Sequence, residues 1–361
     1  MARAAALPAE EGGKRNMAEL LRALRGGQGT RSLTLTARGL HHLPRGLGNM
    51  QGLERLNVRN NRLRQLPQAM ETLSRLKILN LGNNNFEEVP EQLKYLKSLQ
   101  KLHLFGNKIT RITPLIFDGL QNLVLLNLNN NQLSSLPPEI HRLGNLECVS
   151  LDHNQLKCIP KEFCYLQKLR ELHLSHNSIT VLPEEIKNLT KLKILILSRN
   201  QIDDLPDGLC SLEKLKVLDI AGNNIRIFPT AMEDLELEEL YCENNPLLQK
   251  DPVNAIQEED VLTLKELTAR FILSQLENKN VSLHKAIKQN LDAQNILSRK
   301  QKCAQCGCGF LGMWLECVHF VDIRQTMKTS RNLELLPIRV LLCSYKCFNQ
   351  RDHELFGIAV P

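Results

Sequence analysis

Aliphatic residues recur along most of the chain at a fixed interval that is too short for an independent domain. The pattern L-x-x-L-x-(L/I/V)-x-x-N occurs eight times between Leu53 and Asn223, and successive copies start 23 residues apart with one step of 24. A unit of this length cannot bury its own apolar face and must stack on copies of itself. The pattern therefore predicts a right-handed solenoid whose short strands form one parallel sheet.

Each copy ends on an asparagine, whose side-chain amide is both a donor and an acceptor. Such side chains can satisfy backbone groups where the strands turn, so stacked copies are expected to form a ladder. A degenerate unit opens the series near Leu33, with Arg38 in place of the asparagine, and a shortened one closes it at Asn245. The asparagines are Asn61, Asn84, Asn107, Asn131, Asn154, Asn177, Asn200 and Asn223.

A proline follows most of the strands, as at Pro67 and Pro183. Proline suits the entry of a helical turn, so the opposite side of the array is expected to carry short helices or 3₁₀ turns. In the fourth unit the proline is displaced to Pro114 and one residue is added, which predicts an irregularity near Phe117. The repeat resembles the intracellular leucine-rich-repeat class typified by Ras-suppressor and plant Ras-group proteins. This resemblance implies an α/β solenoid with parallel strands on the concave face.

Four regions are expected. Residues 1–29 form an N-terminal tail and capping helix, and residues 30–249 form a solenoid of about ten repeats. Residues 250–300 follow as a capping helix and linker, in which apolar residues at helical spacing would lie on the last repeat. These residues are Val261, Leu264, Leu267, Phe271, Ile272 and Leu276. Residues 301–361 form a cysteine-rich module.

Composition and charge favour an intracellular, most simply cytoplasmic, protein. The first sixteen residues lack the apolar core of a signal peptide, and no apolar stretch approaches the roughly 18 residues of a membrane span. The single cysteines of the repeats indicate reduced thiols. The net charge is +7, but the basic residues are interspersed with acidic ones and form no basic stripe. Aromatic residues make up only 4% of the chain, so the sequence does not favour nucleic-acid binding.

Outward-pointing strand residues are the candidates for binding a partner protein, since alternate side chains of a strand share one face. Cations in the first repeats and anions in the last predict a lengthwise charge polarity, and aliphatic residues predict an exposed apolar patch. Strand-face residues without a partner are the alternative. The candidates are Arg55, Arg59, Ile78, His103, Phe105, Leu125, Asp152, His173, Ile194, Ile196, Val217, Asp219 and Tyr241.

Several histidines near Asp152 could suggest acid–base chemistry, namely His103, His153, His173 and His176. No nucleophile with a general base, glycine-rich phosphate loop or carboxylate pair accompanies them in the sequence. We therefore expect no enzymatic activity.

The segment from Thr263 to Ile272 resembles the elongin C-binding box that opens a SOCS box. The resemblance implies that Leu264 enters the elongin C pocket and that Ile272 is a second anchor, in a helix-in-groove contact. Thr268 stands where that box has cysteine or alanine, and no Leu-Pro pair of a cullin-selecting segment follows closely. A substrate receptor for an elongin B/C and cullin ubiquitin ligase is thus the alternative to an interaction scaffold.

Two close cysteine pairs near the C-terminus, Cys303 with Cys306 and Cys343 with Cys347, predict one structural zinc ion. Four thiolates would leave no open position for water. Further candidate ligands are Cys308, Cys317 and His319, and the alternative is that the thiols are buried free cysteines.

Overall fold

The structure, a computed structural model, describes residues 29–249, 262–278, 281–312, 314–323, 328–329, 334–348 and 355–357. The tail and capping helix expected over residues 1–29 lie outside the described residues except for Gly29. The chain divides into two compact units. The first contains residues 1–224 and 235–245, and the second contains residues 225–234 and 246–361.

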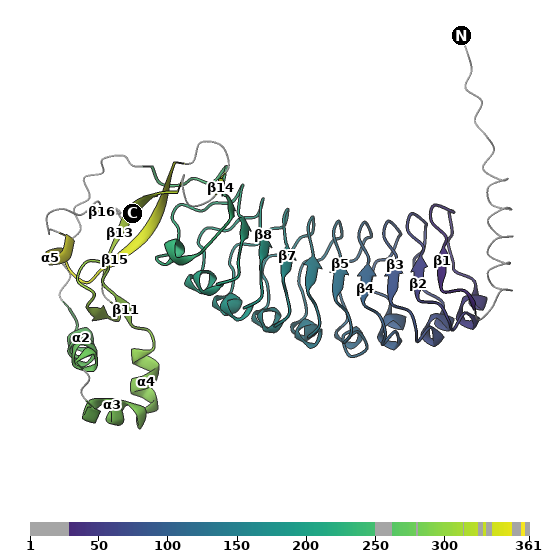
Figure 1. The fold of residues 1–361 in the computed structure, drawn as a ribbon. Coiled ribbons are helices and arrows are strands. Elements are labelled where there is room, and N and C mark those ends of the chain that lie inside the picture. Colours follow the sequence, from purple (N-terminus) through teal and green to yellow (C-terminus); the bar gives the residue numbers. More distant parts are fainter. Residues whose placement is uncertain are drawn as a thin grey trace, which may run out of the picture. The chain divides into compact units, whose positions relative to one another are not determined.

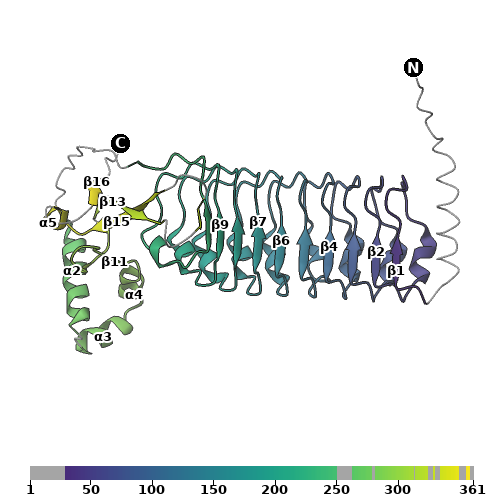
Figure 2. The ribbon, with the colours of Figure 1, turned by 45° about the horizontal axis from the view of Figure 1, so that its top comes forward.

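The repeats of the first unit form successive coils, each of which contributes one short strand to a parallel sheet (Figure 1). Neighbouring strands pair in register, so that Leu56 lies beside Leu79 and Leu79 beside Leu102. Figure 2 shows these strands in a single row. In the described part of the chain they are β1 (Ser32–Thr34), β2 (Arg55–Asn57), β3 (Ile78–Asn80), β4 (Lys101–His103), β5 (Leu125–Asn127), β6 (Cys148–Ser150), β7 (Glu171–His173), β8 (Ile194–Ile196), β9 (Val217–Asp219) and β10 (Glu239–Tyr241).

The predicted asparagine ladder is confirmed. The side-chain amide of Asn84 donates to the carbonyls of Leu81 in its own repeat and Val58 in the preceding one, at 2.9 and 3.1 Å. Its side-chain oxygen accepts a hydrogen bond from the backbone N–H of Leu63 at 3.1 Å. Equivalent bonds recur at the other seven positions of the ladder. Each buried amide therefore satisfies backbone groups that no strand pairing reaches.

The residue before each ladder asparagine has a left-handed backbone. This residue is glycine at Gly106 and Gly222, and asparagine at Asn60, Asn83 and Asn130. Both residue types tolerate positive φ, but His153, His176 and Arg199 adopt it too, with φ of 55°, 55° and 56°. The fixed bend explains why each coil leaves the strand at the same point.

The opposite side of the coils carries 3₁₀ turns, as predicted, and a proline stands at the entry of most of them. The fourth turn differs, because it has three residues and ends at Phe117 in the right-handed helical region. The irregularity expected near Phe117 is thus present. The turns of the first unit are η2 (Arg45–Asn49), η3 (Gln68–Thr72), η4 (Glu91–Tyr95), η5 (Pro114–Ile116), η6 (Pro138–Arg142), η7 (Lys161–Tyr165), η8 (Glu184–Asn188) and η9 (Asp207–Ser211).

The second unit contains two small antiparallel sheets. In one, β13 (Leu315–Asp322) lies between β15 (Leu335–Leu342) and β16 (Leu355–Gly357). In the other, β11 (Gln301–Lys302) pairs with β12 (Gly309–Phe310). Short elements of this unit include η10 (Met232–Asp234), β14 (Lys328–Thr329) and α5 (Tyr345–Phe348).

Residues 225–234 belong to the second unit although they continue the repeat pattern. The N–H of Phe228 donates to the carbonyl of Pro337, and the N–H of Arg339 donates to the carbonyl of Phe228, both at 2.9 Å. Ile227 joins Val318 and Phe320 in a small buried cluster. These contacts explain the division, which the repeat spacing alone does not indicate.

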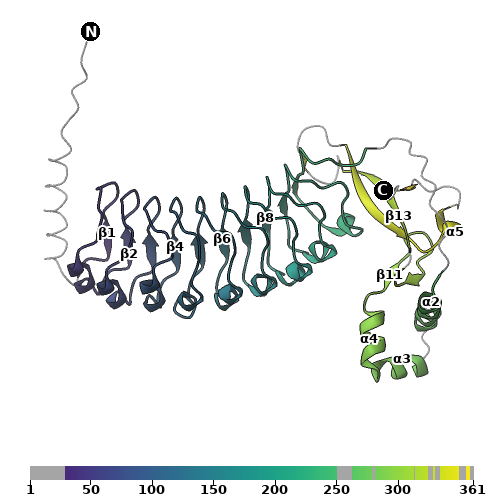
Figure 3. The same cartoon turned by 180° about the vertical axis from the view of Figure 1, so that it is seen from behind.

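Three helices occupy the segment expected to be one helix and a linker. They are α2 (Leu264–Glu277), α3 (Val281–Lys288) and α4 (Leu291–Leu297), and α3 joins the other two in Figure 3. The side chains of Thr263 and Asn290 accept hydrogen bonds from the N–H groups of Glu266 and Ala293, which caps α2 and α4. The Asn290 cap explains why α4 begins where a linker was expected.

The apolar face predicted to pack in α2 is not the buried one. Leu264, Leu267 and Phe271 are exposed, and the buried residues are Glu266, Ala269 and Leu273. The Glu266 carboxylate accepts hydrogen bonds from the N–H groups of Leu311 and Gly312 at 3.1 and 2.8 Å. The predicted packing of Leu264, Leu267 and Phe271 was wrong. The side of α2 that carries Glu266 is buried instead, because the two N–H groups after β12 bind the Glu266 carboxylate.

Within the described residues, helices are too short and too polar to cross a membrane.

Candidate protein-binding face and cysteine cluster

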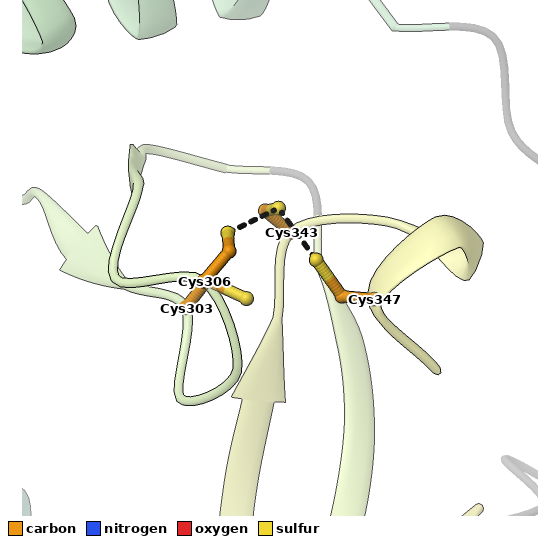
Figure 4. Close-up of side chains that lie close together, drawn as sticks. All are labelled: Cys303, Cys306, Cys343 and Cys347. Carbon is orange, nitrogen blue, oxygen red and sulfur yellow. Dashed lines mark hydrogen bonds between the residues drawn. The ribbon is translucent and has the colours of Figure 1, made fainter. Parts of the chain in front are cut away.

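The four cysteines of the two close pairs come together in the second unit (Figure 4). Cys303 and Cys306 lie on the turn between β11 and β12, where Gly307 has a φ of 73° and its N–H donates to the Cys303 carbonyl. Cys343 follows β15, and Cys347 lies in α5. The turn and the end of β15 are connected, since the N–H of Ala304 donates to the carbonyl of Leu341.

The spacing of the sulfur atoms suits a tetrahedral metal ion. All four Sγ atoms lie within 4.8 Å of one another. The Sγ of Cys343 is 3.5 Å from that of Cys306 and 3.6 Å from that of Cys347. A zinc–sulfur bond of about 2.3 Å places the sulfurs of a tetrahedral site about 3.8 Å apart. The cluster could therefore hold a metal ion with little movement of the side chains.

The thiols of the cluster differ in acidity. Burial opposes ionisation of Cys306, but hydrogen bonds from the Cys308 backbone and from the neighbouring thiols lower its pKa to about 7. Burial and hydrogen bonds to its neighbours raise the pKa of Cys343, and burial raises that of Cys347. Cys306 is thus the more acidic thiol beside Cys343 and Cys347, and a cation would be needed to stabilise four thiolates together.

The further candidate ligands lie outside this cluster. Cys308 is exposed, and Cys317 is buried on β13 in the apolar core of the second unit. His319 lies on the same strand, with Nδ1 3.4 Å from a carboxylate oxygen of Glu233. Among the candidate ligands predicted near the C-terminus, the four cysteines of the two close pairs are therefore the ones that the described residues bring within 4.8 Å of one another.

In the first unit, the candidate partner-binding residues lie in rows along the outward side of the strands. We call this surface the strand face. One row runs from Arg55 through Ile78, Lys101, Leu125, Cys148, Glu171, Ile194 and Val217 to Glu239. The next row runs from Asn57 through Asn80, His103, Asn127, Ser150, His173, Ile196 and Asp219 to Tyr241. Cations stand in the first repeats of this face and anions in the last.

Near the start of the strand face, Phe105 is half-buried rather than exposed. Its ring lies over Gly82, where a Cβ atom would collide with it. The guanidinium carbon of Arg59 is 5.9 Å from the ring centroid, and the His103 ring is 6.4 Å away in an edge-on arrangement. Burial and the nearby Lys101 charge lower the pKa of His103, which favours the neutral imidazole.

Ile194, Ile196 and Val217 form a compact apolar patch on β8 and β9. Ile194 lies directly beside Val217, and Ile196 beside Asp219. The three side chains are half-buried, so the patch is less exposed than the sequence suggested. We call these three residues the apolar patch.

Several polar side chains of the first unit are held by hydrogen bonds or ring contacts within it. Asp152 accepts hydrogen bonds from the N–H of Ser175 and from the Asn129 side chain. Asp219 accepts from the N–H of Ala221, and the Tyr241 hydroxyl donates to Glu239. His153 and His176 stack on each other with ring centroids 4.0 Å apart. These contacts give the residues a structural role that the sequence pattern does not reveal.

The repeat register brings together one group that was not predicted. Cys148, Glu171 and His173 place a sulfur, a carboxylate oxygen and an imidazole nitrogen within 4.8 Å of one another. Of these three residues, only His173 is among the strand-face candidates selected from the sequence. The signal was available, because Cys148 and Glu171 occupy the same position of consecutive repeats and His173 follows two residues later.

Two of the three α2 residues that align with the elongin C-binding box pattern are exposed. The Leu264 side chain is 80% exposed in the first turn, which a residue that enters a partner's pocket requires. Thr268 is exposed as well and its hydroxyl donates to the Leu264 carbonyl, whereas Ile272 is half-buried.

A solenoid of parallel strands and 3₁₀ turns, joined by an asparagine ladder, defines the class of this protein. Family models agree, since "Leucine rich repeat" matches residues 28–86, 51–109 and 97–156, and "Leucine-rich repeat region" matches residues 156–329. The chain belongs to the leucine-rich-repeat family. It is 69% identical to leucine-rich repeat-containing protein 69 of Xenopus laevis over 243 residues, which cover 67% of this chain and 70% of the frog protein.

Other relatives match over shorter stretches. The chain is 49% identical to the protein of the same name from Homo sapiens over 124 residues, or 34% of this chain and 36% of the human protein. Among solved structures, it is similar to the plant peptide hormone receptor RGFR1 in complex with RGF2, with 29% identity and a TM-score of 0.50 over 59% of this chain and 40% of the receptor. PEPR1-AtPEP1 gives 26% identity and a TM-score of 0.51 over 60% of this chain and 32% of that one.

Proposed function

We propose that this protein is a non-enzymatic interaction scaffold that binds a partner protein on its strand face. The observation that carries the proposal is the apolar patch, in which three aliphatic side chains meet solvent on neighbouring strands. Contiguous apolar surface of this kind is characteristic of interaction sites. The asparagine ladder holds the strands in place, so the patch is preorganised and a partner pays little ordering entropy.

The charges of the strand face suggest how the partner is oriented. Arg55, Arg59 and Lys101 stand in the early repeats, and Asp219 and Glu239 stand in the late ones. A partner with acidic residues toward the first repeats and basic residues toward the last would be favoured in one orientation. Binding should therefore weaken as salt is added, while the apolar contact remains.

Solved relatives support a polypeptide ligand. RGFR1, whose repeats resemble this array, is a peptide hormone receptor in complex with RGF2. We place the present chain inside the cell, where its eleven free cysteines would stay reduced.

Two variants and one control test this proposal. Ile196→Asp introduces a charge into the apolar patch, and Phe105→Ala removes the aromatic ring near Arg59. Val181→Asp is the control, because Val181 is also an apolar side chain but is 64% exposed outside the strand face. Partners recovered by the wild-type chain from cells should bind Ile196→Asp at least about tenfold more weakly and Val181→Asp equally well. Phe105→Ala should also bind more weakly than wild type, and equal binding by all four chains, with unchanged thermal midpoints, would refute the strand face as the site.

We also propose that the four-cysteine cluster binds one structural zinc ion. The sulfur spacing and the close pairs support zinc, which favours four thiolates in a tetrahedron. With every coordination position filled by protein, the ion would stabilise the second unit and would not activate water.

A second candidate function, recruitment of elongin B/C and a cullin, is favoured by the exposure of Leu264. An amphipathic helix that inserts one leucine into a groove needs that leucine free of its own protein. Leu264→Ala should abolish co-purification of elongin C and the cullin while other partners remain. Leu291→Ala is a suitable control, since Leu291 is 75% exposed on α4. If elongin C is not recovered with the wild-type chain, this candidate is wrong and the scaffold proposal is unaffected.

A further inference from the structure

A second group of metal-binding side chains lies in the middle of the strand face. The side chains of Cys148, Glu171 and His173 lie close together. The Cys148 sulfur, a Glu171 carboxylate oxygen and a His173 ring nitrogen lie within 4.8 Å of one another. The Nε2 atom of His173 is 4.0 Å from a carboxylate oxygen of Glu171. We call these three residues the Cys148 cluster.

The repeat register creates this cluster. Cys148 on β6 pairs with Glu171 on β7, and Ser150 pairs with His173. The two β7 residues are two positions apart, so their side chains point to the same side of the sheet. Because both strands are fixed by the ladder, the cluster stands on a rigid frame.

We propose that the Cys148 cluster binds a zinc ion through one thiolate, one carboxylate and one imidazole, with a fourth position open toward solvent. All three are zinc ligands, and bonds of about 2.0–2.3 Å place tetrahedral ligand atoms about 3.5 Å apart. The nitrogen–oxygen distance in the cluster exceeds that value by about 0.5 Å, which small side-chain rotations can close. The thiolate and carboxylate together would neutralise the charge of the ion.

The surroundings favour metal binding. Leu125 lies beside Cys148 on one side, and Ile194 lies beside Glu171 on the other. Ile196 lies beside His173. Aliphatic neighbours exclude water from the flanks of a site and strengthen the attraction between ion and ligands. All three ligand side chains remain half-buried, so an ion can enter from solvent.

A nucleophilic role for the thiol fits the site less well. Burial and the neighbouring Glu171 carboxylate raise the pKa of Cys148 to about 11. Catalytic cysteines need the opposite environment, in which a cation lowers the pKa and thiolate forms readily. The carboxylate beside the thiol disfavours a thiolate in the absence of a metal but is itself a ligand when a metal binds.

This inference is independent of the proposed partner, because zinc alone is the probe. The Cys148 cluster nevertheless adjoins the apolar patch, since Glu171 and His173 lie beside Ile194 and Ile196 on the neighbouring strand. A water molecule or a donor atom of a bound protein could complete the tetrahedron.

Native mass spectrometry of the full, reduced chain at micromolar zinc tests the site. His173→Gln and Cys148→Ser should each bind one zinc ion fewer than the wild-type chain. Cys158→Ser is the control, because Cys158 is an exposed thiol outside the cluster, and it should bind as many ions as wild type. Because each variant is compared with the wild-type zinc count, the result is clear whether or not the four-cysteine cluster also binds zinc.

Cobalt(II) provides a second readout. Titration of the wild-type chain should show a sulfur-to-cobalt absorption that is lost in part in Cys148→Ser, and His173→Gln should weaken cobalt binding at this site at least about tenfold. Circular dichroism should show the same fold for every variant. Identical zinc counts and identical cobalt titrations for wild type, His173→Gln and Cys148→Ser would overturn the proposal.

Discussion

The Sγ atoms of Cys306 and Cys343 lie 3.5 Å apart although 37 residues separate the two cysteines in the chain. The turn after β11 presents one thiol and the end of β15 presents the other. The contact brings the two close pairs into one cluster of four thiols, whereas each pair alone would offer a metal ion only two ligands.

Replacement of Cys306 should release zinc from this cluster. In metal analysis of purified protein, Cys306→Ser should bind one zinc ion fewer than wild type and should lower the unfolding midpoint of the second unit. Cys308→Ser is the matched control, since Cys308 lies two residues away and outside the cluster. An equal loss of zinc in both variants would contradict the assignment of the ligands.

Loss of a ladder asparagine should destabilise the repeats. Asn154→Ala removes hydrogen bonds to the carbonyls of Leu128 and Leu151 and leaves the N–H of Leu133 without its acceptor. Buried unsatisfied groups cost about 1–3 kcal/mol each, so chemical unfolding followed by circular dichroism should show a loss of about 2–4 kcal/mol. Gln155→Ala changes an exposed neighbour and should alter the free energy of unfolding by less than about 0.5 kcal/mol. Similar losses in both variants would contradict the role of the ladder.

Most of the first unit was predictable because one physical constraint repeats along it. Leucines and an asparagine at fixed positions determine the strand, its register and its bend. Where one repeat departs from the pattern, the neighbouring repeats still indicate its structure. The grouping of residues 225–234 with the second unit could not be predicted in this way. It depends on backbone hydrogen bonds between Phe228 and β15, which join segments about a hundred residues apart.

Protonation of Glu266 should weaken the second unit. Burial opposes its charge, but Arg270 and the N–H groups of Gly312 and Leu311 lower its pKa below 4.5. A lowered pKa in the folded state means that the contribution to stability is present above the unfolded pKa and is lost as pH falls through the folded value. Glu266→Gln should therefore cost about 2 kcal/mol at pH 7, and this cost should shrink as pH falls below the unfolded value of about 4.3 and through the lower folded value.

The single tryptophan, Trp314, can follow this unfolding because it lies beside Phe310, with ring centroids 6.0 Å apart. Glu277→Gln is the control, since Glu277 is exposed at the other end of α2. A wild-type advantage over Glu266→Gln that stays constant from pH 7 to pH 3 would disprove the proposed linkage.

The candidate sites were predictable to different extents. Spacing alone identified the cysteine pairs, because close pairs are a local feature of the sequence. The face that α2 buries was not predictable from periodicity, since Glu266 is held by two backbone amides 45 and 46 residues away. The Cys148 cluster required the strand register, which converts a separation of 23 residues between Cys148 and Glu171 into neighbouring positions.

A methyl group at Gly119 should disturb the irregular fourth repeat. A Cβ atom there would overlap the backbone carbonyl of Lys94, which cannot rotate away as a side chain can. Gly119→Ala should therefore lower the free energy of unfolding by about 1–3 kcal/mol in chemical denaturation. Gly144→Ala has open space around the new methyl group and should be neutral or slightly stabilising. Equal stability of the two variants would show that the repeat accommodates the methyl group.

Site-specific photo-crosslinking tests the binding role of the strand face most directly. A photoreactive amino acid at position 196 reports what touches the apolar patch, and one at position 187, on the exposed turn η8, reports the opposite side of a neighbouring coil. The account predicts that a discrete protein crosslinks in cells at position 196 and not at position 187. Crosslinks to the same proteins at both positions, or to none at position 196, would contradict it.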